Sequence, residues 1–96
     1  MSFKELKKIK IAIVAGGWSS ERSVSINSGK NVFNTLKKNG YKVRFFDLKK
    51  NNLHELFKSK PDLIFNALHG EFGEDGGISC LAKKYNTTIT HSEDIS

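Results

Sequence analysis

The segment Ile9-Lys-Ile-Ala-Ile-Val-Ala15, followed directly by Gly16-Gly17, decides the fold class of this 96-residue chain. It is short, rich in β-branched residues and closed by two glycines, which is the pattern of a buried strand that ends in a tight turn. From Ser20 onward the apolar residues recur at a helical period, and Gly40 after two lysines marks the end of that helix. A buried strand followed at once by a helix predicts the first half of a βαβ unit.

The rest of the chain continues this alternation of strand and helix. We expect further strands at 42–47, 62–68 and 87–90, and further helices at 53–58 and 77–85. The helical side chains expected to face the core are Val24, Val32, Phe33, Leu36, Leu53, Leu56 and Phe57. Such alternation implies right-handed crossovers and a parallel sheet. The sequence therefore predicts a single α/β domain over residues 1–96, with a four-stranded parallel sheet.

Two loops rich in glycine and ionisable residues follow the first and third expected strands, at 15–29 and 66–77. Ligands of open parallel sheets bind beyond the carboxyl ends of the strands. The strand order 2-1-3-4 makes the first and third strands neighbours and brings both loops to one crevice. The order 3-2-1-4 would place a strand between them. We predict the first order, and the hypothesis of a shared site depends on it.

Composition excludes several classes of function. The net charge of +6 comes almost wholly from lysines, since Arg22 and Arg44 are the only arginines. Because nucleic-acid recognition favours the forked arginine guanidinium, these scattered lysines weigh against a nucleic-acid partner.

The amino terminus lacks the apolar region of a signal peptide, and no segment has the length of a membrane span. The single Cys80 excludes an internal disulfide, which fits a reducing cytoplasm, and we therefore predict a cytoplasmic protein. We expect the Cys80 side chain in the core, where free cysteine is common.

The first loop places Ser20 and Glu21 at the expected helix start. Unpaired backbone N–H groups at such an end attract anions, and Gly16 and Gly17 let the backbone approach a ligand closely. The alternative is structural: Ser20 is a natural N-cap, and Glu21 in the first turn favours the helix dipole. The loop has neither a G-x-G-x-x-G pattern nor the lysine of a phosphate-binding loop, so we expect no nucleotide site in this chain.

The second loop gathers four ionisable residues within seven positions, His69, Glu71, Glu74 and Asp75. One histidine among carboxylates is a weak metal signal, because zinc sites pair their ligands at typical spacings, and we predict no metal site. In the functional interpretation, the His69 imidazole is hydrogen-bonded to a carboxylate and faces an anionic group. The structural alternative is a polar turn in which Asp75 caps the following helix.

Two motifs together carry a resemblance to a known family. Residues 16–29 follow the pattern G-G-x-S-x-E-R-x-V-S-x-x-S-G, and residues 67–76 follow A-L-H-G-x-x-G-E-D-G. Over about residues 9–92 the chain resembles the amino-terminal domain of D-alanine–D-alanine ligase, an ATP-grasp enzyme. The resemblance implies a Rossmann-like three-layer domain, followed in the complete enzyme by central and carboxy-terminal domains that clamp ATP and Mg²⁺.

The same resemblance implies roles for individual residues. In that family ATP converts the carboxylate of one D-alanine to an acyl phosphate, and the amino group of a second D-alanine attacks it to give a dipeptide for peptidoglycan. Glu21 would then engage the ammonium group of the first D-alanine, and Val24 would line the space for its methyl group. His69 would lie near the reacting carboxylate, supported by Glu74. The catalytic candidates are therefore Glu21 and His69, and the substrate-binding candidates are Val24, Glu74 and Ser20, the last at the anion-attracting helix start.

The chain departs from the family at two places. Ser23 stands where the family usually carries a second glutamate, and after Ser92 the chain reads Glu93-Asp-Ile-Ser96 instead of continuing with Gly-Val into a helix. We interpret the chain as a fragment without the ATP-grasp domains, which binds no nucleotide and has no ligase activity alone. The resemblance implies that the complete enzyme would use D-alanine, ATP and Mg²⁺; ligases of this family are commonly dimers, which makes a homodimer one expectation and leaves the oligomeric state open. The alternative is a non-catalytic α/β module that binds a small anionic ligand or a partner protein.

Overall fold

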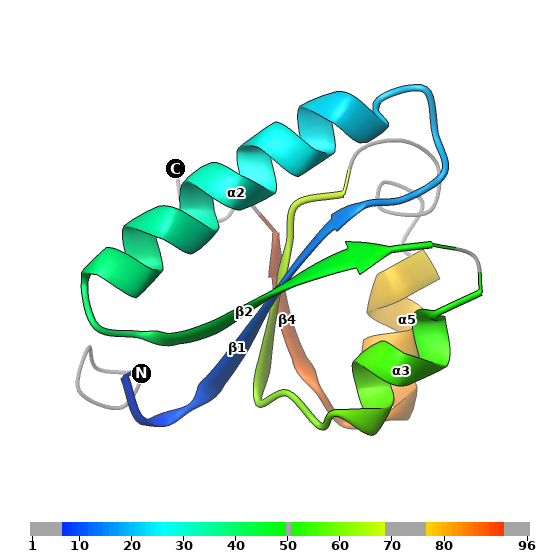
Figure 1. The fold of residues 1–96 in the computed structure, drawn as a ribbon. Coiled ribbons are helices and arrows are strands. Elements are labelled where there is room, and N and C mark those ends of the chain that lie inside the picture. Colours follow the sequence, from blue (N-terminus) through cyan, green and yellow to red (C-terminus); the bar gives the residue numbers. More distant parts are fainter. Residues whose placement is uncertain (1–6, 50, 69–76, 92–96) are drawn as a thin grey trace.

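The computed structural model describes residues 7–49, 51–68 and 77–91, and a four-stranded sheet organises this part of the chain (Figure 1). The strands are β1 (Lys10–Gly16), β2 (Lys42–Leu48), β3 (Leu63–Asn66) and β4 (Thr88–His91), and the helices are α2 (Arg22–Lys38), α3 (Leu53–Lys58) and α5 (Gly77–Lys84). The strand order is β2-β1-β3-β4, and all neighbouring strands are parallel. The predicted order is confirmed.

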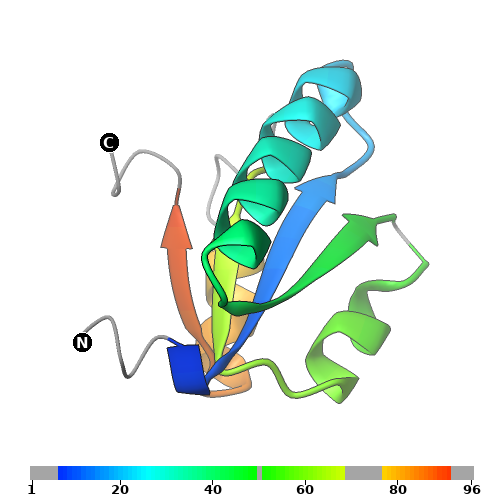
Figure 2. The ribbon, with the colours of Figure 1, turned by 60° about the vertical axis from the view of Figure 1, so that its left-hand side comes forward.

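The helices cover both faces of the sheet. Helix α2 lies on one face, and α3 and α5 lie on the other, as the two views in Figure 1 and Figure 2 show. Side chains alternate along β1, so that Ile11 and Ile13 pack with α2, whereas Ala12 and Val14 pack with α3 and α5. Both faces of β1 are therefore buried, which explains its nearly continuous apolar sequence. The predicted Rossmann-like three-layer arrangement is confirmed.

The two helices on the second face contribute short apolar stripes to the core. Leu56 and Phe57 of α3 and Ile78 and Ala82 of α5 are buried, and Leu53 packs against the same cluster. The predicted inward side of α3 is thus confirmed. Within the described ranges, no helix is both long enough and apolar enough to cross a membrane.

Helix α2 lies very close to β1 at Gly29. A Cβ atom at this position would fall 2.6 Å from the Cβ atom of Ala15 and 3.1 Å from Cε2 of Phe45. Atoms at the first distance overlap, so only glycine permits this spacing between the helix and the sheet. Gly29 therefore sets how closely the middle of α2 can approach β1.

Two residues that we expected in the core are exposed. Val24 is 55% exposed, because it stands two residues, or about 200°, from Ile26 on the helix, and Ile26 packs against the sheet. Cys80 is also exposed. It stands two residues from both Ile78 and Ala82, which are the buried side of α5. Both predictions were wrong because they rested on the apolar character of a stretch and not on the side of the helix that each residue faces.

Strand β3 ends at Asn66, two residues earlier than expected. The buried Asn66 side chain accepts a hydrogen bond from the Leu68 amide, with 3.0 Å between Oδ1 and the nitrogen. This local hydrogen bond occupies the Leu68 amide, which in a longer β3 would donate to a neighbouring strand. Ala67 and Leu68 nevertheless remain buried beyond the strand.

Candidate functional site

The carboxyl ends of β1 and β3 lie side by side at one edge of the sheet. Val14 of β1 is opposite Asn66 of β3, and beyond this pair the Ala67 amide donates to the Val14 carbonyl at 2.9 Å. A Cβ atom built on Gly17 would lie 3.4 Å from Cδ2 of Leu68, so the two loops begin within van der Waals reach of each other. The predicted adjacency of the two strand ends is confirmed.

Ser25 joins these strand ends from the first turn of α2. Its hydroxyl accepts a hydrogen bond from the Gly16 amide at 2.8 Å and donates one to the Ala67 carbonyl at 2.7 Å. The side chain is fully buried. A buried hydroxyl is stable here because it both donates and accepts, and it supplies partners to two backbone groups that lie beyond the ladder between β1 and β3.

Arg22 and Asp47 fasten the same turn to β2. The guanidinium Nη2 donates to Asp47 Oδ2 at 2.7 Å, and Nη1 donates to the Gly17 carbonyl at 3.1 Å. Gly17 in turn donates its amide to the Leu48 carbonyl at 2.9 Å. An arginine guanidinium is always charged in proteins, and the hydrogen bond to Asp47 raises the pKa of Arg22 further.

Gly16 is required where these contacts converge. Its φ is +94°, and an added Cβ would fall 2.5 Å from Asp47 Oδ1 and 2.6 Å from Arg22 Nη1. Asp47 Oδ1 is itself buried and has no hydrogen-bond partner among the described residues. A side chain at position 16 would therefore displace the ion pair and the turn that it holds.

Glu21, the first catalytic candidate, is the N-cap residue of α2 and is exposed. Its side chain makes no capping hydrogen bond. The prediction that Ser20 caps the helix was wrong. Instead the Ser19 hydroxyl accepts the Glu21 amide at 3.2 Å and the Ser19 carbonyl accepts the Arg22 amide at 3.2 Å, so a turn precedes the helix and delays its start. The carboxylate of Glu21 is not used to build the helix start.

Two apolar side chains close to Glu21 in the sequence are exposed. Val24 is 55% exposed and Trp18 is 41% exposed. Val24 follows Glu21 by three residues, which places both on the same side of the helix start. Exposure rules out a core role for Val24 but suits the predicted contact with a substrate methyl group. Ser20 is likewise exposed in the turn before the helix.

His69 and Glu74, predicted as catalytic and substrate-binding residues, lie outside the described residues, as do Glu71 and Asp75. Their predicted roles stay predictions. The described chain reaches Leu68 at the same sheet edge as Gly17.

Sequence reasoning assigned no role to Ser25, Arg22 or Asp47, which hold the loop in place. A signal for Ser25 was present. Positions 25, 29, 32 and 36 follow a helical period, and the first two are the buried residues of α2. A serine in the core-facing stripe of a helix must find buried partners.

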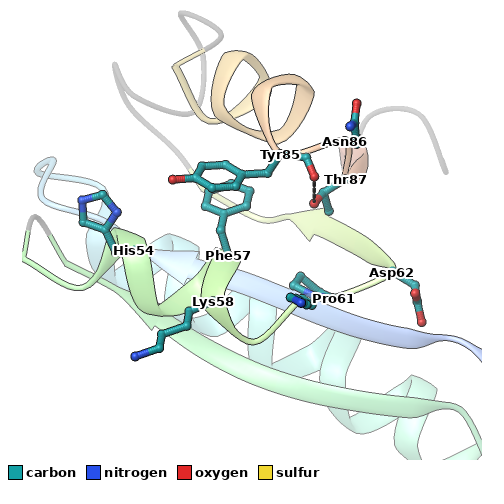
Figure 3. A pocket seen from close by; sticks show the side chains of 9 residues that line it. His54, Phe57, Lys58, Pro61, Asp62, Tyr85, Asn86 and Thr87 are labelled. Carbon is teal, nitrogen blue, oxygen red and sulfur yellow. Dashed lines mark hydrogen bonds between the residues drawn. The ribbon is translucent and has the colours of Figure 1, made fainter.

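A second concave surface lies at the opposite edge of the sheet, between the turns that follow α3 and α5 (Figure 3). Its volume is about 640 Å³. The rings of Phe57 and Tyr85 stack inside it with centroids 4.6 Å apart and planes at 13°. Lys60 and Asn86, both with left-handed backbone, line its edge. None of the described candidate residues lines this groove. It is therefore separate from the carboxyl edge, the side of the sheet at which β1 and β3 end.

Comparisons with known proteins point to one family. Residues 10–61 match the family described as D-ala D-ala ligase N-terminus. The chain is 45% identical over 87 residues to the D-alanine–D-alanine ligase of Novosphingobium aromaticivorans, covering 91% of this chain and 28% of that enzyme. It is 48% identical over 83 residues to the D-alanine–D-alanine ligase of Pelagibacter ubique, covering 86% of this chain and 27% of that enzyme.

A solved structure is similar over the same region. The crystal structure of D-alanine–D-alanine ligase from Bacillus anthracis complexed with ATP superposes with a TM-score of 0.75 and 34% sequence identity. The superposition covers 85% of this chain and 27% of that one. The chain thus spans only 27–28% of the length of these relatives.

Proposed function

Because the chain belongs to the D-ala D-ala ligase N-terminus family, we propose that it is the part of an ATP-dependent D-alanine–D-alanine ligase that binds the first D-alanine. The complete enzyme would join two D-alanine molecules, a step towards peptidoglycan. One observation carries the assignment of the site. Glu21 presents an exposed carboxylate, not used for capping, at the sheet edge where β1 and β3 end together.

The proposed roles follow from the chemistry of D-alanine, which carries an ammonium group, a methyl group and a carboxylate. The Glu21 carboxylate binds and orients the ammonium group through charge-assisted hydrogen bonds. Val24, exposed on the same side of α2, contacts the methyl group. Ser20 contributes a hydroxyl from the preceding turn. Holding the ammonium and methyl groups together fixes the direction of the reacting carboxylate.

The proposed partner residues come from the second loop. His69 would face the reacting carboxylate and stabilise negative charge that develops there, and Glu74 would orient the imidazole. The support for this is that β3, which precedes these residues in the sequence, ends beside the end of β1.

The described residues at this edge do not fit the phosphates of ATP. The Glu21 carboxylate stands at the helix start where a phosphate would need to bind, and like charges repel. The Arg22 guanidinium is already paired with Asp47. We therefore propose that ATP and Mg²⁺ bind to ATP-grasp domains of the complete enzyme outside this chain, and that the chain alone binds no ATP and has no ligase activity.

We also propose that the complete enzyme works in the cytoplasm, where ATP is available, and forms a homodimer. Sedimentation of the complete enzyme tests the second point. In the non-catalytic alternative, the chain binds a small anion or a partner protein. Glu21 then binds no D-alanine.

A chimeric enzyme tests the proposed function. This chain replaces the matching amino-terminal segment of the Novosphingobium aromaticivorans ligase, and D-alanyl-D-alanine and released phosphate are measured with Mg-ATP and D-alanine. We expect product from the chimera and none from the 96-residue chain alone. The parent ligase and the ligase without its amino-terminal segment are the controls. A chimera that folds and binds ATP but yields no dipeptide contradicts the proposal.

A further inference from the structure

Ser25 connects the two halves of the carboxyl edge through one buried hydroxyl. The Gly16 amide reaches Ser25 Oγ from β1, and the Ala67 carbonyl accepts from it just after β3. The distances, 2.8 and 2.7 Å, are those of well-formed hydrogen bonds. Because a hydroxyl has one proton, donating to Ala67 leaves its lone pairs to accept from Gly16.

The connection crosses a place where the ladder between β1 and β3 has ended. The ladder between β1 and β3 pairs Ile11 with Leu63 at one end and Val14 with Asn66 at the other. Gly16 and Ala67 lie beyond the last pair, so the serine extends the pairing across the start of both loops. It also belongs to α2, whose N-cap is Glu21.

Backbone and side chain of this helical turn act together. The Ser25 amide donates to the Glu21 carbonyl at 3.0 Å, while the Ser25 hydroxyl holds both strand ends. Ser25, which is fully buried, thereby links Glu21 to the end of β3.

We propose that Ser25 is a positioning residue, which holds the β1–α2 loop carrying Glu21 at a fixed distance from the end of β3. It does not touch substrate. This inference rests on the proposed function for its catalytic consequence, whereas the connection itself is a property of the folded chain. Loss of the hydroxyl would remove the hydrogen-bonded link between Gly16 and Ala67, and small displacements of an orienting group lower reaction rates steeply.

The first experiment measures the connection in the chain itself. Amide hydrogen exchange is followed by NMR in the wild-type chain, in Ser25→Ala and in Ser59→Ala. Ser59 is the matched control, because its hydroxyl also donates to a backbone carbonyl, that of Leu56 at 2.7 Å, beyond the end of α3. We expect the Gly16 amide to exchange on the order of tenfold faster in Ser25→Ala, as for one lost hydrogen bond, and to be unchanged in the control.

The second experiment measures the catalytic consequence in the chimera. We expect Ser25→Ala to lower kcat/KM for D-alanine by about tenfold to a hundredfold, with unchanged affinity for ATP. Ser25→Cys keeps the shape of the side chain, but its larger sulfur forms longer and weaker hydrogen bonds, and it should give an intermediate value. If Ser25→Ala does not fold, Ser25→Cys carries both measurements.

The outcomes separate the inference from the proposed function. Faster Gly16 exchange with unchanged kinetics in an active chimera overturns the positioning role, and unchanged Gly16 exchange overturns the connection. An inactive wild-type chimera counts against the proposed function, and the exchange data then still decide whether Ser25 holds the strand ends together.

Discussion

Arg22 and Asp47 form an ion pair of 2.7 Å between Nη2 and Oδ2 that joins the start of α2 to the end of β2. The guanidinium also donates to the Gly17 carbonyl, so it spans the whole turn that precedes the helix. Both side chains are 39% exposed. Pairs so open to solvent add little to global stability. The importance of this one is therefore local, in the shape of the turn.

We predict that Arg22→Gln changes the turn more than it changes global stability. The variant loses the ion pair and the fork that reaches Gly17, so the emission of Trp18, the one tryptophan of the chain, should shift. The melting temperature should fall only slightly, and the effect of the substitution should shrink at high salt, because salt screens an exposed pair. Asp47→Asn in the same background should add little further change, since its partner is gone. Independent effects of the two substitutions would contradict the pairing.

Gly29→Ala should destabilise the chain by about 1–3 kcal/mol, the usual range for overpacking. The added methyl would overlap Ala15 Cβ at 2.6 Å, and this outweighs the gain of about 1 kcal/mol that alanine brings to a helix. Urea unfolding of the variant measures the loss. Lys30→Ala, at an exposed neighbouring position, is the control and should change stability by less than about 0.5 kcal/mol.

A second substitution tests the same contact. Ala15→Gly removes the atom that Gly29→Ala would meet, so the double variant should lose less stability than the two single variants together. Additive losses would mean that the helix moves away from the sheet instead.

Most of the fold was predictable from local sequence because the strand, turn and helix signals of successive segments all indicate the same alternating arrangement. The β-branched run before Gly16 predicts a buried central strand, and the alternation of strand and helix predicts parallel pairing. Element ends were less predictable. β3 stops at Asn66 because its side chain takes the Leu68 amide, a local competition that apolar character alone does not reveal.

The candidate site was predictable only in part. The position of Glu21 after the first strand located it at the carboxyl edge. The role of Ser25 depends on Gly16 and Ala67, which are 9 and 42 residues away in sequence, and such partners come together only in the folded sheet. The exposure of Val24 depended on helical phase.

Cys80 should react in the native chain. Its side chain is exposed on α5, so a thiol reagent should label it at the rate of a free thiol without unfolding. Cys80→Ser should change the free energy of unfolding by less than about 0.5 kcal/mol, because no buried contact is lost. Labelling that requires denaturant would show that the thiol is buried.

Lys60→Gly should stabilise the chain by up to about 1 kcal/mol. Lys60 has a φ of 52° after α3, where a side chain is strained and glycine is not. Asn86→Gly is the matched control, because Asn86 has a φ of 55° after α5 and asparagine tolerates this region. It should change stability less. Thermal unfolding of both variants makes the comparison, and equal effects would contradict the strain at Lys60.

Glu21→Gln in the chimeric ligase separates a substrate-binding role from a structural one. The variant keeps the shape of the side chain and removes the charge that should hold the ammonium group of the first D-alanine. We expect kcat/KM for D-alanine to fall about a hundredfold, which corresponds to about 3 kcal/mol of transition-state stabilisation.

Stability should change far less in the same variant, because the Glu21 side chain makes no capping hydrogen bond and a charge at an exposed helix start contributes only about 0.3–1 kcal/mol. Steady-state kinetics and thermal unfolding of one preparation give both quantities. Glu21→Asp, which keeps the charge on a shorter side chain, should retain more activity than Glu21→Gln. Unchanged kinetics together with a lower melting temperature would leave Glu21 as a residue of the helix start, and the ammonium of D-alanine would need another partner.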